Sequence, residues 1–211
     1  LLLQKILGEF LIKEKTFLSG ITYNNRITDL SSFSRFNINI IPEFSVYLYQ
    51  DSMKRKRDID ILIEISDEKN NILYSICVEN KITDSSIIKN DSQLEDELQG
   101  LKNYYLVSDQ APEIYLVYLT PYPSEKSRES FNKLSYERKI HIFWDNEDNN
   151  ESIFSKLNDI FNEEQRGFID PINDQSMYLI KSFQSFIKTG FKSYIEEKNE
   201  RKEKNSYGKP V

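Results

Sequence analysis

The sequence predicts an α/β fold in which helices flank a mixed β-sheet, with additional helices at the C-terminal end. Three observations predict it. Three short segments rich in β-branched and aromatic residues follow one another between polar turns. A fourth segment is apolar throughout, and the neighbouring stretches place apolar residues at every third or fourth position, the period of an amphipathic helix. The predicted order is therefore α-β-β-β-α-β-(α)-β, followed by two closing helices.

The N-terminal half supplies the opening helix and an antiparallel meander. Apolar residues recur with helical spacing over residues 2–18. The three candidate strands are residues 44–49, 59–65 and 72–78. The stretches between them have the composition of hairpin loops. The first loop holds residues 51–53 and a basic cluster, and the second covers residues 66–71.

The C-terminal half alternates helices with two further strands. Residues 91–106 return to helical spacing, with Asp91 or Ser92 as the N-cap. Residues 114–119 are apolar throughout, which is typical of a central parallel strand covered on both faces. The remaining predicted elements are a helical segment at 127–138, a short strand at 140–144, and helices at 152–165 and 174–197 on either side of Asp170-Pro171.

These elements predict one domain over residues 1–200 and a flexible tail over residues 201–211. The helix at 174–197 carries a long apolar stripe. We expect this stripe to pack on its own core, and the alternative is a contact with a second copy in a homodimer.

Cysteine and histidine usage excludes several classes of site. The 211 residues include one cysteine, Cys77, and one histidine, His141. Disulfide frameworks and Cys/His zinc sites are therefore excluded by ligand count, and carboxylates must carry any metal chemistry. His141 lies in an apolar strand, and we expect a hydrogen-bonded core or edge histidine there. Low cysteine content and the absence of an export signal or long apolar run predict a cytoplasmic protein without membrane contact.

The formal net charge of −6 argues against a broad basic surface that wraps nucleic acid. A local basic cluster nevertheless precedes the strand at 59–65. It consists of Lys54, Arg55, Lys56 and Arg57. Two interpretations stay open: the cluster contacts a phosphate backbone, or it is a solvated turn.

Three charged residues are predicted to meet at one edge of the sheet. Asp60 is near the start of its strand, whereas Glu79 and Lys81 are near the end of the next and share a face. In an antiparallel pair these two positions lie side by side. Mg²⁺ is commonly held by one or two carboxylates with waters and substrate phosphate, and the Asn80 carbonyl is a further candidate ligand. The set fits phosphodiester hydrolysis, with Lys81 positioning water or stabilising the transition state; the alternative is a simple ion pair at the strand end, in which Arg57 is a second candidate cation.

Four runs of sequence follow one another in this part of the chain: Arg57-Asp58-Ile59-Asp60-Ile61-Leu62-Ile63, Val78-Glu79-Asn80-Lys81-Ile82, Gln93-Leu94 and Tyr118-Leu119-Thr120-Pro121. They resemble the bacterial branch of the PD-(D/E)XK nuclease superfamily, in which similar runs recur in the same order. The resemblance covers residues 57–121 strongly and 140–160 weakly. It implies a restriction-endonuclease-like sheet, metal ligation by Asp60 and Glu79, and a catalytic Lys81.

The resemblance also implies two outlying site residues. Gln93 would form a hydrogen bond near the site, with Gln99 as the alternative; the tyrosine that the family carries about four residues later is absent. Glu9 would complete the metal site from the first helix, unless it faces solvent. Asp58 is the alternative to Asp60 as the aspartate of the family motif, and we expect the two side chains to share one strand face.

The predicted function is that of a Mg²⁺- or Mn²⁺-dependent endonuclease that acts on DNA in restriction, anti-phage defence or repair. DNA is the expected partner. The alternative is a catalytically inactive module of the same fold that binds nucleic acid or a protein partner.

Overall fold

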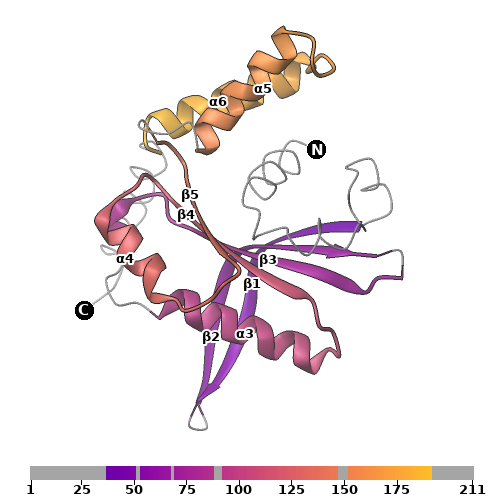
Figure 1. Cartoon of the computed structure of the whole chain (residues 1–211), viewed down its shortest axis with the longest axis vertical. Helices are drawn as coiled ribbons and strands as arrows, with labels where there is room; N and C mark the ends of the chain where they lie inside the picture. Colours follow the sequence, from indigo (N-terminus) through magenta and orange to yellow (C-terminus); the bar gives the residue numbers. More distant parts are fainter. Residues whose placement is uncertain (1–36, 51–52, 68, 88–91, 147–151, 192–211) are drawn as a thin grey trace, which may run out of the picture. The chain divides into compact units, whose positions relative to one another are not determined.

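The computed structural model describes residues 37–50, 53–67, 69–87, 92–146 and 152–191 (Figure 1). Over these residues the protein is α/β, with one five-stranded mixed sheet. The chain divides into two compact units, Leu1–Ile142 and Phe143–Val211. The predicted helix at 2–18 and the predicted tail at 201–211 lie outside the described residues.

The sheet follows the order of the chain. Its strands, in the order β1-β2-β3-β4-β5, are β1 (Asn37–Gln50), β2 (Met53–Ser66), β3 (Ile72–Asn80), β4 (Glu113–Thr120) and β5 (Lys139–Phe143). β1, β2 and β3 pair antiparallel, which confirms the predicted meander. β3 and β4 pair parallel, and β4 is buried from Ile114 onwards. The predicted buried parallel strand is therefore confirmed.

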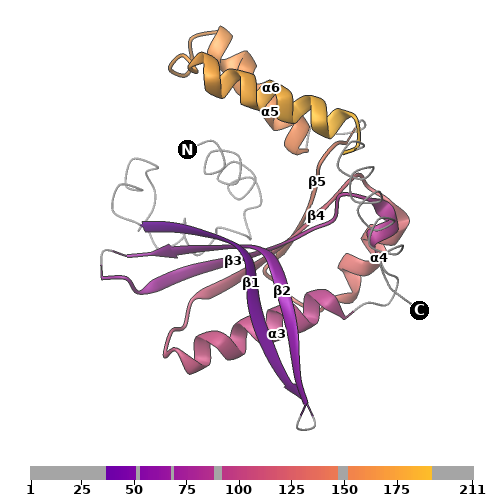
Figure 2. The same cartoon turned by 180° about the vertical axis from the view of Figure 1, so that it is seen from behind.

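β1 and β2 continue beyond the sheet as a two-stranded arm (Figure 2). Each strand has 14 residues, and β2 pairs with β3 only from Ile61 onwards. The prediction that residues 54–57 belong to the turn is wrong, because Gln50 pairs with Met53 and the ladder runs through the basic cluster. A two-stranded arm can hold such a polar stretch because its faces need not both be buried.

Helix α3 (Gln93–Val107) lies across β1 and β2 and connects β3 to β4 (Figure 1). This element confirms the helix predicted at 91–106. Its buried apolar residues follow helical spacing: Leu94, Leu98, Leu101 and Tyr105. Gly100 lets the helix approach β1 closely, since a Cβ at this position would lie 2.6 Å from Val46 Cγ2.

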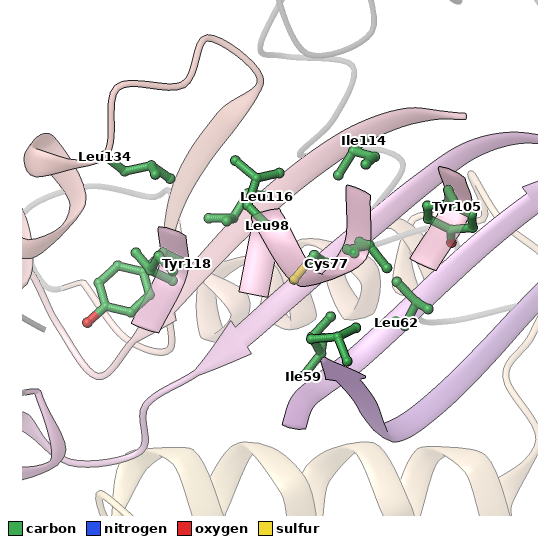
Figure 3. Close-up of a cluster of buried hydrophobic side chains, with 12 residues drawn as sticks. Ile59, Leu62, Cys77, Leu98, Tyr105, Ile114, Leu116, Tyr118 and Leu134 are labelled. Atoms are coloured by element: carbon green, nitrogen blue, oxygen red, sulfur yellow. The ribbon is translucent and has the colours of Figure 1, made fainter. Parts of the chain in front are cut away.

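The core beneath α3 joins the helix to residues of β1, β2, β3 and β4, and most of these residues are drawn in Figure 3. Leu62, Cys77, Leu101 and Leu116 are completely buried in it. At its edge the Tyr105 hydroxyl lies 2.7 Å from Glu64 Oε1 and 2.9 Å from Ser75 Oγ. Each buried leucine contributes on the order of 1.5–3 kcal/mol of transfer free energy, so this packing holds α3 in a fixed position on the strands.

Helix α4 (Glu125–Lys133) is shorter than the predicted segment at 127–138. The chain turns extended at Leu134, whose side chain is buried. Lys139 Nζ then donates to the carbonyl oxygens of Phe131 and Leu134, both at 2.7 Å. A cation at the last carbonyls stabilises a helix end, which explains why α4 ends there.

The second unit contains helices α5 (Ile153–Gln165) and α6 (Asp174–Lys188), which pack together. The prediction that the last helix continues to residue 197 is wrong. Gly190 has φ 63°, its N–H donates to Ile187, and the Phe191 N–H donates to Phe186. This pattern is a Schellman motif, which ends a helix at a left-handed glycine. No helix in the described part of the chain is both long and apolar enough to cross a membrane.

Candidate functional site

The middle of β2, the end of β3 and the first turn of α3 lie near one another and carry several charged and polar side chains. Asp60 lies in β2 one residue before the pairing with β3 begins. Its Oδ2 accepts the backbone N–H of Asn80 at 2.7 Å. The hydrogen bond brings the Asp60 carboxylate to the end of β3, as the antiparallel arrangement predicts.

Glu79, Lys81 and Gln93 contact one another directly. Lys81 Nζ lies 2.6 Å from Glu79 Oε1 and donates to Gln93 Oε1 at 2.9 Å. Gln93 Nε2 donates to Glu79 Oε1 at 2.7 Å. The first turn of α3 therefore completes a closed triangle with the end of β3. Gln93 reaches the site because the leucines that follow it hold the helix against the sheet.

Glu97 also belongs to this cluster, and the sequence analysis missed it. Its Oε1 accepts from Gln93 Nε2 at 2.8 Å. Glu97 lies three residues after Leu94 and four before Leu101, so helical spacing assigns it to the apolar face of α3. A carboxylate at a core position of an amphipathic helix was the signal that could have identified it.

The two glutamates are almost completely removed from water. Glu79 is 2% exposed and Glu97 0%, whereas the Lys81 side chain keeps 16% exposure. Glu79 Oε2 and Glu97 Oε2 are buried and have no hydrogen-bond donor among the described residues. Burying an anion without compensation is costly, so this pair requires a proton or a cation.

The pKa values of the two carboxyls respond to this burial. Burial raises the pKa of Glu97, and the neighbouring charge of Glu79 raises it further. Burial also raises the pKa of Glu79, opposed by the Lys81 ammonium and assisted by the Asp60 carboxylate. The Lys81 ammonium opposes the rise at Glu79 more strongly than at Glu97, so Glu97 is the carboxyl that keeps a proton more readily.

The two pairs of alternative residues separate in the structure. Asp58 accepts from Ser45 Oγ at 2.6 Å and pairs with Lys56 in an exposed position. The side chain of Gln99 is exposed and donates to Asn103. Asp60 and Gln93 are therefore the members of each pair that lie in the cluster.

The expectation that Asp58 and Asp60 share one strand face is wrong. Ile59 and Leu62 both belong to the buried cluster, so the two-residue alternation of β2 is interrupted between them. In β1, Glu43 lies between the residues that pair with Ile59 and Ile61 and has φ 52°. Asp60 contacts the Asn80 N–H of β3, whereas Asp58 contacts Ser45 and Lys56 of the arm.

The basic cluster of the arm is partly neutralised by acidic partners. Arg57 and Arg55 contact Asp96 Oδ2 at 2.7 and 3.2 Å, and Lys56 pairs with Asp58. Asp96 lies in the first turn of α3, where the helix dipole favours an acid. The side chain of Lys54 lies outside the described residues, as does Glu9.

The donor set fits a hard divalent cation. Among the described residues, no three His, Cys, Asp or Glu side chains form a metal cage. Mg²⁺ does not require one, because it is commonly bound by one or two carboxylates together with waters and substrate phosphate. Asp60 and Glu79 are two such carboxylates, and the buried Glu79 Oε2 lacks a hydrogen-bond donor in this part of the chain. The Asn80 carbonyl is the third candidate ligand.

His141 is a packed histidine, as predicted. Its Nε2 lies 2.8 Å from Thr120 Oγ1, and its ring stacks on Tyr118 and Phe131. Burial lowers the pKa of His141 to about 4. His141 is therefore neutral near pH 7.

Comparison of this chain with protein-family models, with curated proteins and with solved structures found no match.

Proposed function

We propose that the protein is a metal-dependent nuclease that hydrolyses phosphodiester bonds in DNA, with Asp60, Glu79, Lys81 and Gln93 as its site. One observation carries the proposal: the Asp60 carboxylate accepts the backbone N–H of Asn80, between Glu79 and Lys81, whose side chains contact each other and Gln93. The similarity of residues 57–121 to PD-(D/E)XK nucleases supports the same assignment. A restriction-endonuclease-like arrangement of the sheet is part of this proposal.

Lys81 is suited to the transition state of phosphodiester hydrolysis. Its ammonium carries three hydrogens, two of which are directed at Glu79 and Gln93. The third can be donated to the attacking water or to a phosphate oxygen, where negative charge develops. Glu79 and Gln93 restrict the position of Nζ, so this donor is preorganised. The Lys81 side chain keeps only 16% exposure, which strengthens its electrostatic effect.

Asp60 and Glu79 would hold a divalent cation, with the Asn80 carbonyl as a third ligand. A bound cation of this kind supplies a Lewis acid that polarises the scissile phosphate and lowers the pKa of a coordinated water. Asp60 is half-buried and Lys81 keeps partial exposure, so the substrate would approach from their side of the cluster.

A cleavage assay tests the proposal. Supercoiled and linear DNA are incubated with the purified chain in Mg²⁺ or Mn²⁺, and in EDTA. We expect cleavage that requires the metal, and a loss of about 100-fold or more in Lys81→Ala and Asp60→Ala. Asp58→Ala is the matched control, because Asp58 lies two residues away and contacts Ser45 and Lys56 of the arm. This variant should cleave like the wild type. Cleavage that survives Lys81→Ala, or that proceeds in EDTA, would refute the assignment.

A further inference from the structure

Glu97 is a fully buried carboxyl group on the core-facing side of α3. Burial of an acid in an apolar core lowers stability unless it makes a compensating contact. The compensating contact of Glu97 is with Gln93, one helical turn earlier. Gln93 in turn contacts both Glu79 and Lys81. Glu97 is therefore hydrogen-bonded to the site through the Gln93 amide.

The hydrogen-bond capacity of that amide determines its orientation. An ammonium can only donate, so Lys81 requires the oxygen of Gln93 to face it. The two hydrogens of Nε2 are then directed at Glu79 Oε1 and Glu97 Oε1, at 2.7 and 2.8 Å. Without an acceptor at position 97, one of these buried hydrogens loses its partner, which removes one of the three contacts that hold the amide in this orientation.

A reversed amide would be incompatible with the contact to Lys81. The Gln93 NH₂ group would face the ammonium, and two sets of donors would meet without an acceptor. Lys81 would keep only Glu79 Oε1 among these partners and would lose its second restraint. A loss of positioning of this kind slows a reaction without weakening the binding of substrate.

We propose that Glu97 is a positioning residue of the nuclease site, which restrains the Gln93 amide together with Glu79 and so helps to hold Lys81 in its reactive place. This inference rests on the proposed function for its catalytic consequence. It extends the site by a residue that lies beyond the reach of the substrate, since its side chain is fully buried.

Two substitutions at Glu97 separate positioning from simple packing. Glu97→Leu removes the acceptor, and Glu97→Gln keeps an amide oxygen that can accept from Gln93. We expect Glu97→Leu to lower kcat for plasmid cleavage by about 10- to 100-fold with little change in KM, and Glu97→Gln to restore most of the activity. In a Gln93→Leu background, Glu97→Leu should have almost no additional effect, because both changes interrupt the same link.

Glu64→Leu is the matched control. It also replaces a carboxylate beneath α3, one that accepts from Tyr105 and lies outside the cluster. This variant should keep the wild-type kcat. Equal losses in Glu97→Leu and Glu97→Gln, additive losses in the Gln93→Leu background, or an equal loss in Glu64→Leu would each overturn the positioning role.

A second measurement is independent of cleavage. The side-chain NH₂ signals of Gln93, assigned in metal-free ¹⁵N-labelled protein by their loss in Gln93→Leu, should shift and broaden in Glu97→Leu and largely recover in Glu97→Gln. Unchanged signals in Glu97→Leu would refute the positioning role. If the wild-type chain cleaves no DNA while the signals respond as expected, the nuclease assignment fails but Glu97 still orients Gln93.

Discussion

Replacing Glu97 with leucine should change how the stability of the protein depends on pH. In the folded protein burial raises the pKa of Glu97, so this carboxyl keeps its proton at pH values where the unfolded chain has released it. A raised pKa in the folded state contributes stability below the unfolded pKa, near 4.3. That contribution is lost as the pH rises toward the folded pKa.

The size of the effect follows from one bound proton. Each pH unit above the unfolded pKa costs the wild type about 1.4 kcal/mol of unfolding free energy through Glu97. Between pH 5 and pH 7 the loss is therefore about 2.7 kcal/mol. Leucine at position 97 binds no proton, so Glu97→Leu should gain stability relative to the wild type by this amount over the same interval.

Urea denaturation at pH 5, 6 and 7 in EDTA measures this difference. Leu101→Ala is the control: it removes a fully buried apolar side chain from the same helix and should lower stability by about 2–5 kcal/mol at every pH. If the free-energy difference between the wild type and Glu97→Leu is independent of pH, the pKa of Glu97 is not raised in the folded protein and the reasoning fails.

Three further predictions concern packing, pH and charge. Gly100→Ala should destabilise the protein by about 1–3 kcal/mol in urea denaturation, because the new methyl group meets Val46 at 2.6 Å; Val46→Ala should relieve much of this cost if the contact is responsible. Burial lowers the pKa of His141, so its contribution to stability is present above pH 6.5 and is lost as the pH falls toward 4. As the pH falls from 6.5 to 4, the free energy of unfolding of His141→Gln should therefore decrease by up to about 2.5 kcal/mol less than that of the wild type. Thermal or urea unfolding measures this difference, and equal decreases would exclude a buried neutral histidine. Asp96→Asn releases Arg57 from its ion pair and should strengthen DNA binding with a steeper salt dependence in fluorescence anisotropy; unchanged binding would mean that the arm does not meet phosphate.

The strands and α3 were predictable because their patterns are local. β-branched residues between polar turns predict the meander, and Leu94, Leu98 and Leu101 share one helical face. The meeting of Asp60 with the end of β3 followed from a general property of antiparallel pairs. Periodicity and pairing therefore position much of the cluster before any coordinate is known.

Other features depend on contacts between distant residues. The interruption of alternation in β2 coincides with Glu43 of the partner strand, so the separation of Asp58 from Asp60 could not be predicted within one strand. The extent of the arm depends on the pairing of Gln50 with Met53. Glu97 carried a local signal, an acid on an apolar helix face. Its link to the site could not be predicted, because it depends on the contact of Gln93 with Lys81.

The thiol of Cys77 can report on the opening of the sheet. It is the single cysteine of the chain, lies fully buried in β3 two residues before Glu79, and burial raises the pKa of its thiol. Thiol reagents attack the thiolate, so modification requires the strand to open. The rate of Cys77 labelling at low denaturant therefore measures how often β3 opens. A divalent ion that binds beside Glu79 would lower this labelling rate, and no engineered probe is needed to detect it.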